Sequence, residues 1–113
     1  RQSGNFQIGR VGWVGDYQDP SYFLELCLAD SGNNDGKYNN PEFDALMAKA
    51  ASMPAGEERF EVLRQAEEML VTEDQAIIPF YFYVTQNMID LEKWDGWYTN
   101  TQDIHPYLGI KRK

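Results

Sequence analysis

The strongest constraint on the fold is a pair of amphipathic helices predicted near the middle of the chain. The first is expected to begin at Asn40-Pro41, because asparagine is a favoured N-cap and proline fits the first helical turn. Its apolar residues recur at helical spacing, at Phe43, Leu46, Met47 and Ala50. Residues 52–56 interrupt the pattern, and this short connection implies that the two helices lie antiparallel.

The second helix is predicted from about Gly56 to Thr72. Its apolar stripe consists of Phe60, Leu63, Ala66, Met69 and Leu70. Charged residues, Arg59 among them, lie mostly outside this stripe. They are expected to form a solvated face and not a binding site.

Extended segments are predicted on either side of the helices. Residues 5–14 alternate between apolar and polar positions, which indicates a strand. Residues 76–84 are the most hydrophobic segment, and Pro79 places them at a sheet edge or at its entry. The side expected to face a core carries Ile78, Phe80, Phe82 and Val84. Residues 88–91 are a further candidate strand, whereas the tail from Glu92 has no clear period and is expected to lie over another surface.

Size and charge narrow the function. The 113 residues suit one domain or part of one. The net charge is −8, and basic residues cluster only at Lys111-Arg112-Lys113. Nucleic acids and anionic membranes are bound through clustered Lys and Arg, so the sequence argues against both partners. An acidic surface suits ligands that carry positive charge.

The candidate binding segment covers residues 12–20, with the sequence GWVGDYQDP. It joins the predicted N-terminal strand to residues 20–28, an apolar run expected to form a short and well-buried helix. Two uses of the segment compete. Its aspartates can cap the following helix, with Asp19 at the N-cap, or the glycine-rich turn can approach a ligand at the end of a strand.

Recognition of an extended ligand is the more natural functional use of this segment. A strand edge that ends in Gly12 to Gly15 can offer backbone N–H and C=O groups to a peptide. Asp16 would then pair with a cationic group such as a free α-amine. Trp13 would form one wall of a side-chain pocket.

Catalytic and metal chemistry find little support. The single cysteine, Cys27, excludes a disulfide within the chain, and one histidine, His105, leaves little for acid–base catalysis. The Asn- and Asp-rich loop 30–40 lacks the spacing of an EF-hand, so neither a metal nor a cofactor is predicted. Asp16, Asp19 and the abundant aromatics keep one alternative open, a carbohydrate-binding module or glycan-active enzyme.

Residues 12–24, GWVGDYQDPSYFL, resemble the GW-x-x-DY-x-DP-x-x-FL signature of bacterial oligopeptide-binding proteins. These are the extracytoplasmic solute-binding components of ABC importers. Further blocks agree in order with that family: NN at 33–34, YNNPEFD at 38–44, Arg59 with Ala66-Glu67, IIPFYFYV at 77–84, and Gly96-Trp97 with Asp103. The resemblance covers essentially the whole chain, although family members are several times longer.

The resemblance implies an α/β (α+β) fold, the C-terminal lobe of a two-lobed periplasmic-binding-protein-like structure of class II, cluster C. Residues 1–80 would form part of this lobe, with a strand, a buried helix and the helix pair. Residues 81–113 would supply a hinge strand and a tail that returns to the N-terminal lobe. The chain would then be the C-terminal portion of a longer protein, and the N-terminal lobe would be a missing partner.

The resemblance also implies a site and a role. Asp16 would hold the α-amino group of a peptide, while Trp13, Val14 and Gly15 pair with its backbone and shape a pocket. Tyr17 matches the motif without an assigned role. The protein would not be an enzyme. It would be periplasmic, or a cell-surface lipoprotein anchored by an absent N-terminus, and would deliver peptides to membrane permease subunits.

A third hypothesis concerns the chain by itself. Without a second lobe it cannot close over a ligand, and its exposed tyrosine and tryptophan side chains would then favour self-association.

Overall fold

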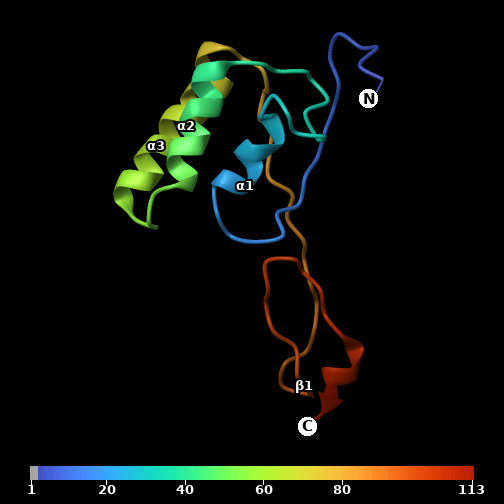
Figure 1. Ribbon diagram of the computed structural model, residues 1–113. Coiled ribbons are helices and arrows are strands. Elements are labelled where there is room, and N and C mark those ends of the chain that lie inside the picture. Colours follow the sequence, from blue (N-terminus) through green and yellow to red (C-terminus); the bar gives the residue numbers. More distant parts are fainter. Residues whose placement is uncertain (1–2) are drawn as a thin grey trace.

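The computed structural model describes residues 3–113, which form a helical part and two extended regions (Figure 1). The molecule measures 56 × 38 × 22 Å, and its radius of gyration is 18.5 Å. A compact domain of this length has a radius of gyration of about 13 Å. The chain is therefore an elongated structure in which only one part is well packed.

The helix pair is as predicted. Helix α2 covers Pro41–Ala51 and α3 covers Glu57–Glu68, and the two lie antiparallel (Figure 1). The Asn40 side chain accepts hydrogen bonds from the backbone N–H groups of Glu42, at 2.9 Å, and Phe43, at 3.4 Å. The predicted N-cap is therefore confirmed, and it satisfies two of the N–H groups that a helix start leaves without intrahelical partners. One π-helical segment, η2 (Met69–Glu73), extends α3.

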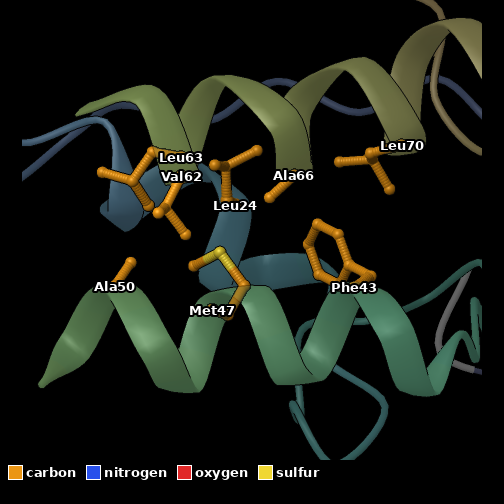
Figure 2. Close-up of a cluster of buried hydrophobic side chains, with 8 residues drawn as sticks. All are labelled: Leu24, Phe43, Met47, Ala50, Val62, Leu63, Ala66 and Leu70. Carbon is orange, nitrogen blue, oxygen red and sulfur yellow. The ribbon is translucent and has the colours of Figure 1, made fainter. Parts of the chain in front are cut away.

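The core lies between α2, α3 and the short helix that precedes them (Figure 2). It consists of Leu24, Phe43, Met47, Ala50, Val62, Leu63, Ala66 and Leu70. The predicted stripe of α3 was wrong at one position, because Val62 is buried whereas Phe60 is 49% exposed. Full burial of a large apolar side chain contributes roughly 1.5–3 kcal/mol, so this cluster stabilises the helical part.

The predicted helix at 20–28 is present but divided. Helix α1 covers Ser21–Leu24, and the 3₁₀-helix η1 covers Glu25–Cys27. The expectation that it is well buried was wrong, since Phe23 is 48% exposed and only Ser21 and Leu24 are buried. One side of this segment packs on the helix pair, and the other is only partly covered, by the turn around Gly15 and Tyr17.

The loop between η1 and α2 is irregular, as predicted, and is organised by buried Asn34. Its amide nitrogen donates to the carbonyl oxygens of Leu28, at 3.1 Å, and Tyr38, at 2.7 Å. Its amide oxygen accepts from the Tyr38 backbone N–H at 3.0 Å. Just after η2, Asp74 accepts hydrogen bonds from the Tyr38 hydroxyl, at 2.6 Å, and from the Asn40 amide, at 2.7 Å. These bonds connect the end of the helix pair to its start.

The strands predicted at 5–14 and 76–84 are absent from the described structure. Both segments are extended, but no backbone hydrogen bond joins them, and they meet through Arg10, which donates to the hydroxyls of Tyr81 and Tyr83. Side chains expected to face a core are 70–96% exposed, namely Ile78, Phe80, Phe82 and Val84. Two strands alone are marginal in water, and here no third strand or helix of the described chain covers them.

The tail is a small clasp remote from the helices (Figure 1). Strand β1 (Trp94–Asp95) pairs antiparallel with β2 (Lys111–Arg112), after the 3₁₀-helix η3 (Tyr107–Gly109). The predicted strand at 88–91 is wrong, because pairing begins only at Trp94. Helices and a small sheet together are compatible with the predicted α+β class.

Candidate functional site

The turn at residues 16–20 is held by Asp19. One carboxylate oxygen of Asp19 accepts the backbone N–H of Ser21 at 2.9 Å. Both oxygens also bind the Arg59 guanidinium, at 2.8 and 2.9 Å. The predicted capping bond is therefore present, although the N-cap position itself falls on Pro20. The turn is anchored both to the start of α1 and to α3, which lies 40 residues further along the chain.

Arg59 corrects the prediction that the charges of α3 are only a solvated face. Its side chain is 12% exposed, and its Nε also donates to the Ala50 carbonyl oxygen at 3.2 Å. The Arg59 hydrogen bonds, assisted by the Ser21 N–H, lower the pKa of Asp19 from 3.8 to about 2. Asp19 is consequently ionised throughout the physiological pH range.

A signal for this contact was present in the sequence. The buried residues of α3 are Val62, Leu63 and Ala66, and Arg59 precedes them by three, four and seven positions. This spacing puts Arg59 on the buried face of the helix. The predicted stripe contained Phe60 in place of Val62, so the predicted buried face of α3 was turned away from Arg59.

Asp16, the first residue of the same turn, is exposed. One of its carboxylate oxygens accepts a hydrogen bond from the Tyr22 hydroxyl at 2.7 Å. The other oxygen accepts none from the described residues. Tyr22 therefore orients the Asp16 carboxylate and leaves one oxygen available. Tyr22 was not predicted as a site residue, although it lies in the same motif block.

Aromatic rings gather around Tyr22. The ring of Tyr17 meets it edge-on at a centroid distance of 4.6 Å, and the ring of Phe23 does so at 5.8 Å. Partial desolvation, followed by the nearby Glu25 and Asp19 carboxylates, raises the pKa of Tyr17, which therefore stays a neutral phenol. Gly15 lies close to Phe23, because a Cβ there would be 3.0 Å from the Phe23 ring, and a larger residue would make that ring shift. Tyr17 and Gly15 thus have structural roles in shaping the turn.

Trp13 and Val14 point to different surroundings. Trp13 lines a hollow of about 770 Å³ between α1, η1 and α2, and Tyr22 is another of its lining residues. Leu26, Leu28 and Met47 are among its apolar lining residues. Its charged lining residues are all acidic, Glu25, Asp30 and Asp44. Val14 is 69% exposed and does not line this hollow. Of the five predicted residues, the structure therefore gathers Trp13, Asp16 and Tyr17 around Tyr22.

The rest of the described chain offers no catalytic constellation. His105 binds Asp103 at 2.7 Å and stacks on Trp97 in the tail, far in sequence from the turn. Burial raises the pKa of the Cys27 thiol, which disfavours a thiolate. Among residues 3–113 there is no group of three or more His, Cys, Asp or Glu side chains arranged to hold a metal ion.

No family model matches the chain. The relatives found by sequence comparison are binding proteins. The periplasmic oligopeptide-binding protein OppA of Salmonella typhimurium is 38% identical over 104 residues, and that of Escherichia coli is 35% identical over 104 residues. Each alignment covers 92% of this chain. The oligopeptide-binding protein OppA of Bacillus subtilis is 42% identical over 82 residues, 72% of this chain.

These comparisons confirm the resemblance seen in the motif blocks. The chain is related, over most of its length, to oligopeptide-binding proteins. It spans 19%, 19% and 15% of the lengths of these three relatives. In the part of the chain that the structure describes, no helix has the length and apolar character needed to cross a membrane.

Proposed function

We propose that this chain belongs to an extracytoplasmic peptide-binding component of an ABC importer and carries the group that binds the ligand's α-amine. The observation that supports this most is the state of Asp16. Its carboxylate is exposed, oriented by Tyr22 and has one oxygen available, in a chain related to oligopeptide-binding proteins. A fixed carboxylate with one free oxygen suits a charge-assisted hydrogen bond to an ammonium group.

The backbone next to Asp16 supports strand-like pairing with a peptide. Residues 11–15 are extended and exposed or half-buried. Their backbone groups make no hydrogen bond within the described chain. Unpaired N–H and C=O groups along an extended segment are what a peptide needs to add as a strand. Trp13, Val14 and Gly15 would line this edge, and Tyr17 would support it through Tyr22.

We assign residues 1–80 to one lobe and 81–113 to the hinge and the tail returning to a second lobe. The exposed apolar side chains at 78, 80, 82 and 84 support this assignment, because such a stripe needs a cover. A preceding N-terminal lobe would supply it. The same proposal includes an extracytoplasmic location, permease subunits as partners, and binding without catalysis.

The carbohydrate alternative is not favoured. As a sugar-binding module it finds no support in the relatives, which are named for binding oligopeptides. As a glycan-active enzyme it would use Asp16 and Asp19 as a catalytic pair, but Asp19 is held by Arg59 with a pKa of about 2. A carboxyl group with this pKa cannot serve as a general acid near neutral pH.

The test of Asp16 uses the full-length protein that contains this chain. We expect a peptide with a free α-amine to bind more tightly than its N-acetylated form. Asp16→Asn should weaken the free-amine peptide by about 2–5 kcal/mol, because the ammonium loses its charged partner. Isothermal titration calorimetry measures both affinities.

Asp95→Asn is the matched control for this substitution. Asp95 is exposed in the tail, and its carboxylate accepts the Gly96 N–H at 2.8 Å, a bond that asparagine can also accept. This variant should bind like the parent. Equal affinity for the free and acetylated peptides, or parental binding by Asp16→Asn, would show that Asp16 is not the amine-binding group.

A further inference from the structure

Arg59 lies where the candidate turn meets both long helices. It comes from the first turns of α3, binds both carboxylate oxygens of Asp19, and donates to the carbonyl of Ala50 near the end of α2. Its guanidinium thus joins three segments through three hydrogen bonds. A lysine cannot reproduce this geometry, because its ammonium is a point charge and lacks a planar fork.

A short series of contacts leads from Asp19 to Asp16. The Asp19 backbone N–H donates to the Tyr17 carbonyl oxygen at 3.2 Å, which closes the turn behind Asp16. The Tyr22 backbone N–H donates to the Asp19 carbonyl oxygen at 3.1 Å. The Tyr22 hydroxyl then donates to the Asp16 carboxylate at 2.7 Å. The position of Asp19 therefore determines where Tyr22 sits, and Tyr22 orients Asp16.

Arg59 also neutralises the second carboxylate of the turn. Asp16 and Asp19 are three positions apart, and among residues 3–113 the carboxylate that Arg59 pairs with is that of Asp19. With that pair in place, Asp16 is the carboxylate of the turn that keeps an oxygen without a partner in the described structure. Without it, Asp19 would be a second anionic group close to the candidate amine site.

We propose that Arg59 is a positioning residue that, through Asp19 and Tyr22, sets the preference of the site for ligands with a free α-amine. The inference rests on the proposed function of Asp16. Arg59 touches no ligand in this scheme. It fixes the direction of the carboxylate, and directional contacts to a small cation weaken when their geometry is relaxed.

The test removes the ion pair without changing the net charge. The double variant Asp19→Asn/Arg59→Gln is compared with Glu61→Gln/Arg64→Gln in the full-length protein. The control also removes a bidentate Arg–carboxylate pair from α3, but that pair is exposed and joins neighbours on one helix. Calorimetry measures the dissociation constants of a peptide and of its N-acetylated form for each protein.

The informative quantity is the ratio of the two dissociation constants. A purely structural role would weaken both peptides equally and leave the ratio unchanged. We expect Asp19→Asn/Arg59→Gln to reduce the ratio by about tenfold, equivalent to about 1.4 kcal/mol, whereas the control keeps the parental value. An unchanged ratio in a folded Asp19→Asn/Arg59→Gln protein would overturn the inference.

Two further outcomes concern a variant that does not fold and a parent that does not discriminate between the two peptides. If the double variant does not give a cooperative thermal transition, Arg59→Lys replaces it. That variant keeps the charge and should reduce the ratio by about threefold, and an unchanged ratio again overturns the inference. If the parent itself does not discriminate between the peptides, the proposed function of Asp16 fails, and this inference fails with it. If the parent discriminates and the variants do so equally, only the role of Arg59 is wrong.

Discussion

The helical part, residues 19–74, and the extended part, residues 4–18 and 75–113, differ in how far they bury their apolar side chains. The helical part contains all eight residues of the buried core. The extended part contains some of the most exposed large apolar side chains, among them Phe82 at 96% and Met88 at 97%. One region thus buries its apolar side chains within the chain, and the other leaves them exposed.

This difference separates two kinds of information in one sequence. In the helical part, apolar spacing and capping residues encode contacts that are local or lie between neighbouring elements. In the extended part, an equally strong apolar pattern finds no covering surface among the described residues. A hydrophobic segment therefore indicates burial, but does not say which surface provides it.

The largest expected effect tests this contrast directly. Phe43 is fully buried, so Phe43→Ala in this chain should destabilise the helical part by about 3–5 kcal/mol, through lost burial and a residual cavity. Phe82→Ala makes the same chemical change at an exposed position and should alter stability by less than about 0.5 kcal/mol. Thermal unfolding followed by circular dichroism at 222 nm measures both. Similar losses from the two variants would show that the extended part is packed in solution.

A smaller effect concerns the Asp19–Arg59 ion pair, at the N-terminal edge of the helical part. The pKa of Asp19 is lowered from 3.8 to about 2, so its stabilising contribution is fully present above about pH 5. As the pH falls through 3.8 towards 2, this contribution is lost, on the order of 2 kcal/mol.

The measurement for Asp19 compares unfolding of the parent and of Asp19→Asn between pH 2 and pH 6. Asparagine cannot titrate, so the stability difference between the two proteins should be largest at pH 6 and shrink towards pH 2. A difference that stays constant with pH would mean that the carboxylate of Asp19 is not held in solution.

The smallest expected effect on the helices comes from the tail. Gly96 has φ of +86°, and a Cβ at this position would lie 1.7 Å from the Gly109 carbonyl oxygen. Gly96→Ala should therefore open the β1–β2 clasp. The helical part should unfold at the parental temperature, because the tail is remote from its core.

Gly109→Ala serves as the control for Gly96→Ala. A Cβ on Gly109 would have only an ordinary contact, 3.6 Å from the Gly96 carbonyl oxygen. Amide hydrogen exchange reports the clasp through the Lys113 N–H, which donates to the Lys93 carbonyl oxygen at 3.0 Å. If Gly96→Ala also lowered the unfolding temperature of the helices, the two regions would be coupled more strongly than this structure indicates.

The sequence was sufficient where a single residue type determines the local conformation. Asn40 and Pro41 predicted the start of α2, because capping and first-turn preferences depend on nearby backbone groups. The strands at 5–14 and 76–84 could not be predicted in this way. A strand exists only when another chain segment accepts its hydrogen bonds, and the described residues do not supply a ladder there.

The candidate site was predicted in part for the same reason. Asp16 and Trp13 were found from their place in a turn next to an extended segment, and their roles in binding stay predictions. Arg59 was missed because its contact with Asp19 spans 40 residues and leaves no local trace beyond its place on the buried face of α3. Tyr22 was missed because a tyrosine in an apolar run resembles a core residue, whereas its hydroxyl reaches back to Asp16.

The cluster of Tyr38, Asn40 and Asp74 has a consequence for the topology. Tyr38 and Asn40 lie just before α2, and Asp74 lies just after η2, so the chain enters and leaves the helix pair at adjacent points. Adjacent ends are the property that allows a segment to be inserted into, or moved between, host proteins without disturbing its surroundings. The helix pair is therefore closed at its base by one amide and one phenol, so that a single set of hydrogen bonds fixes both the entry and the exit of the chain.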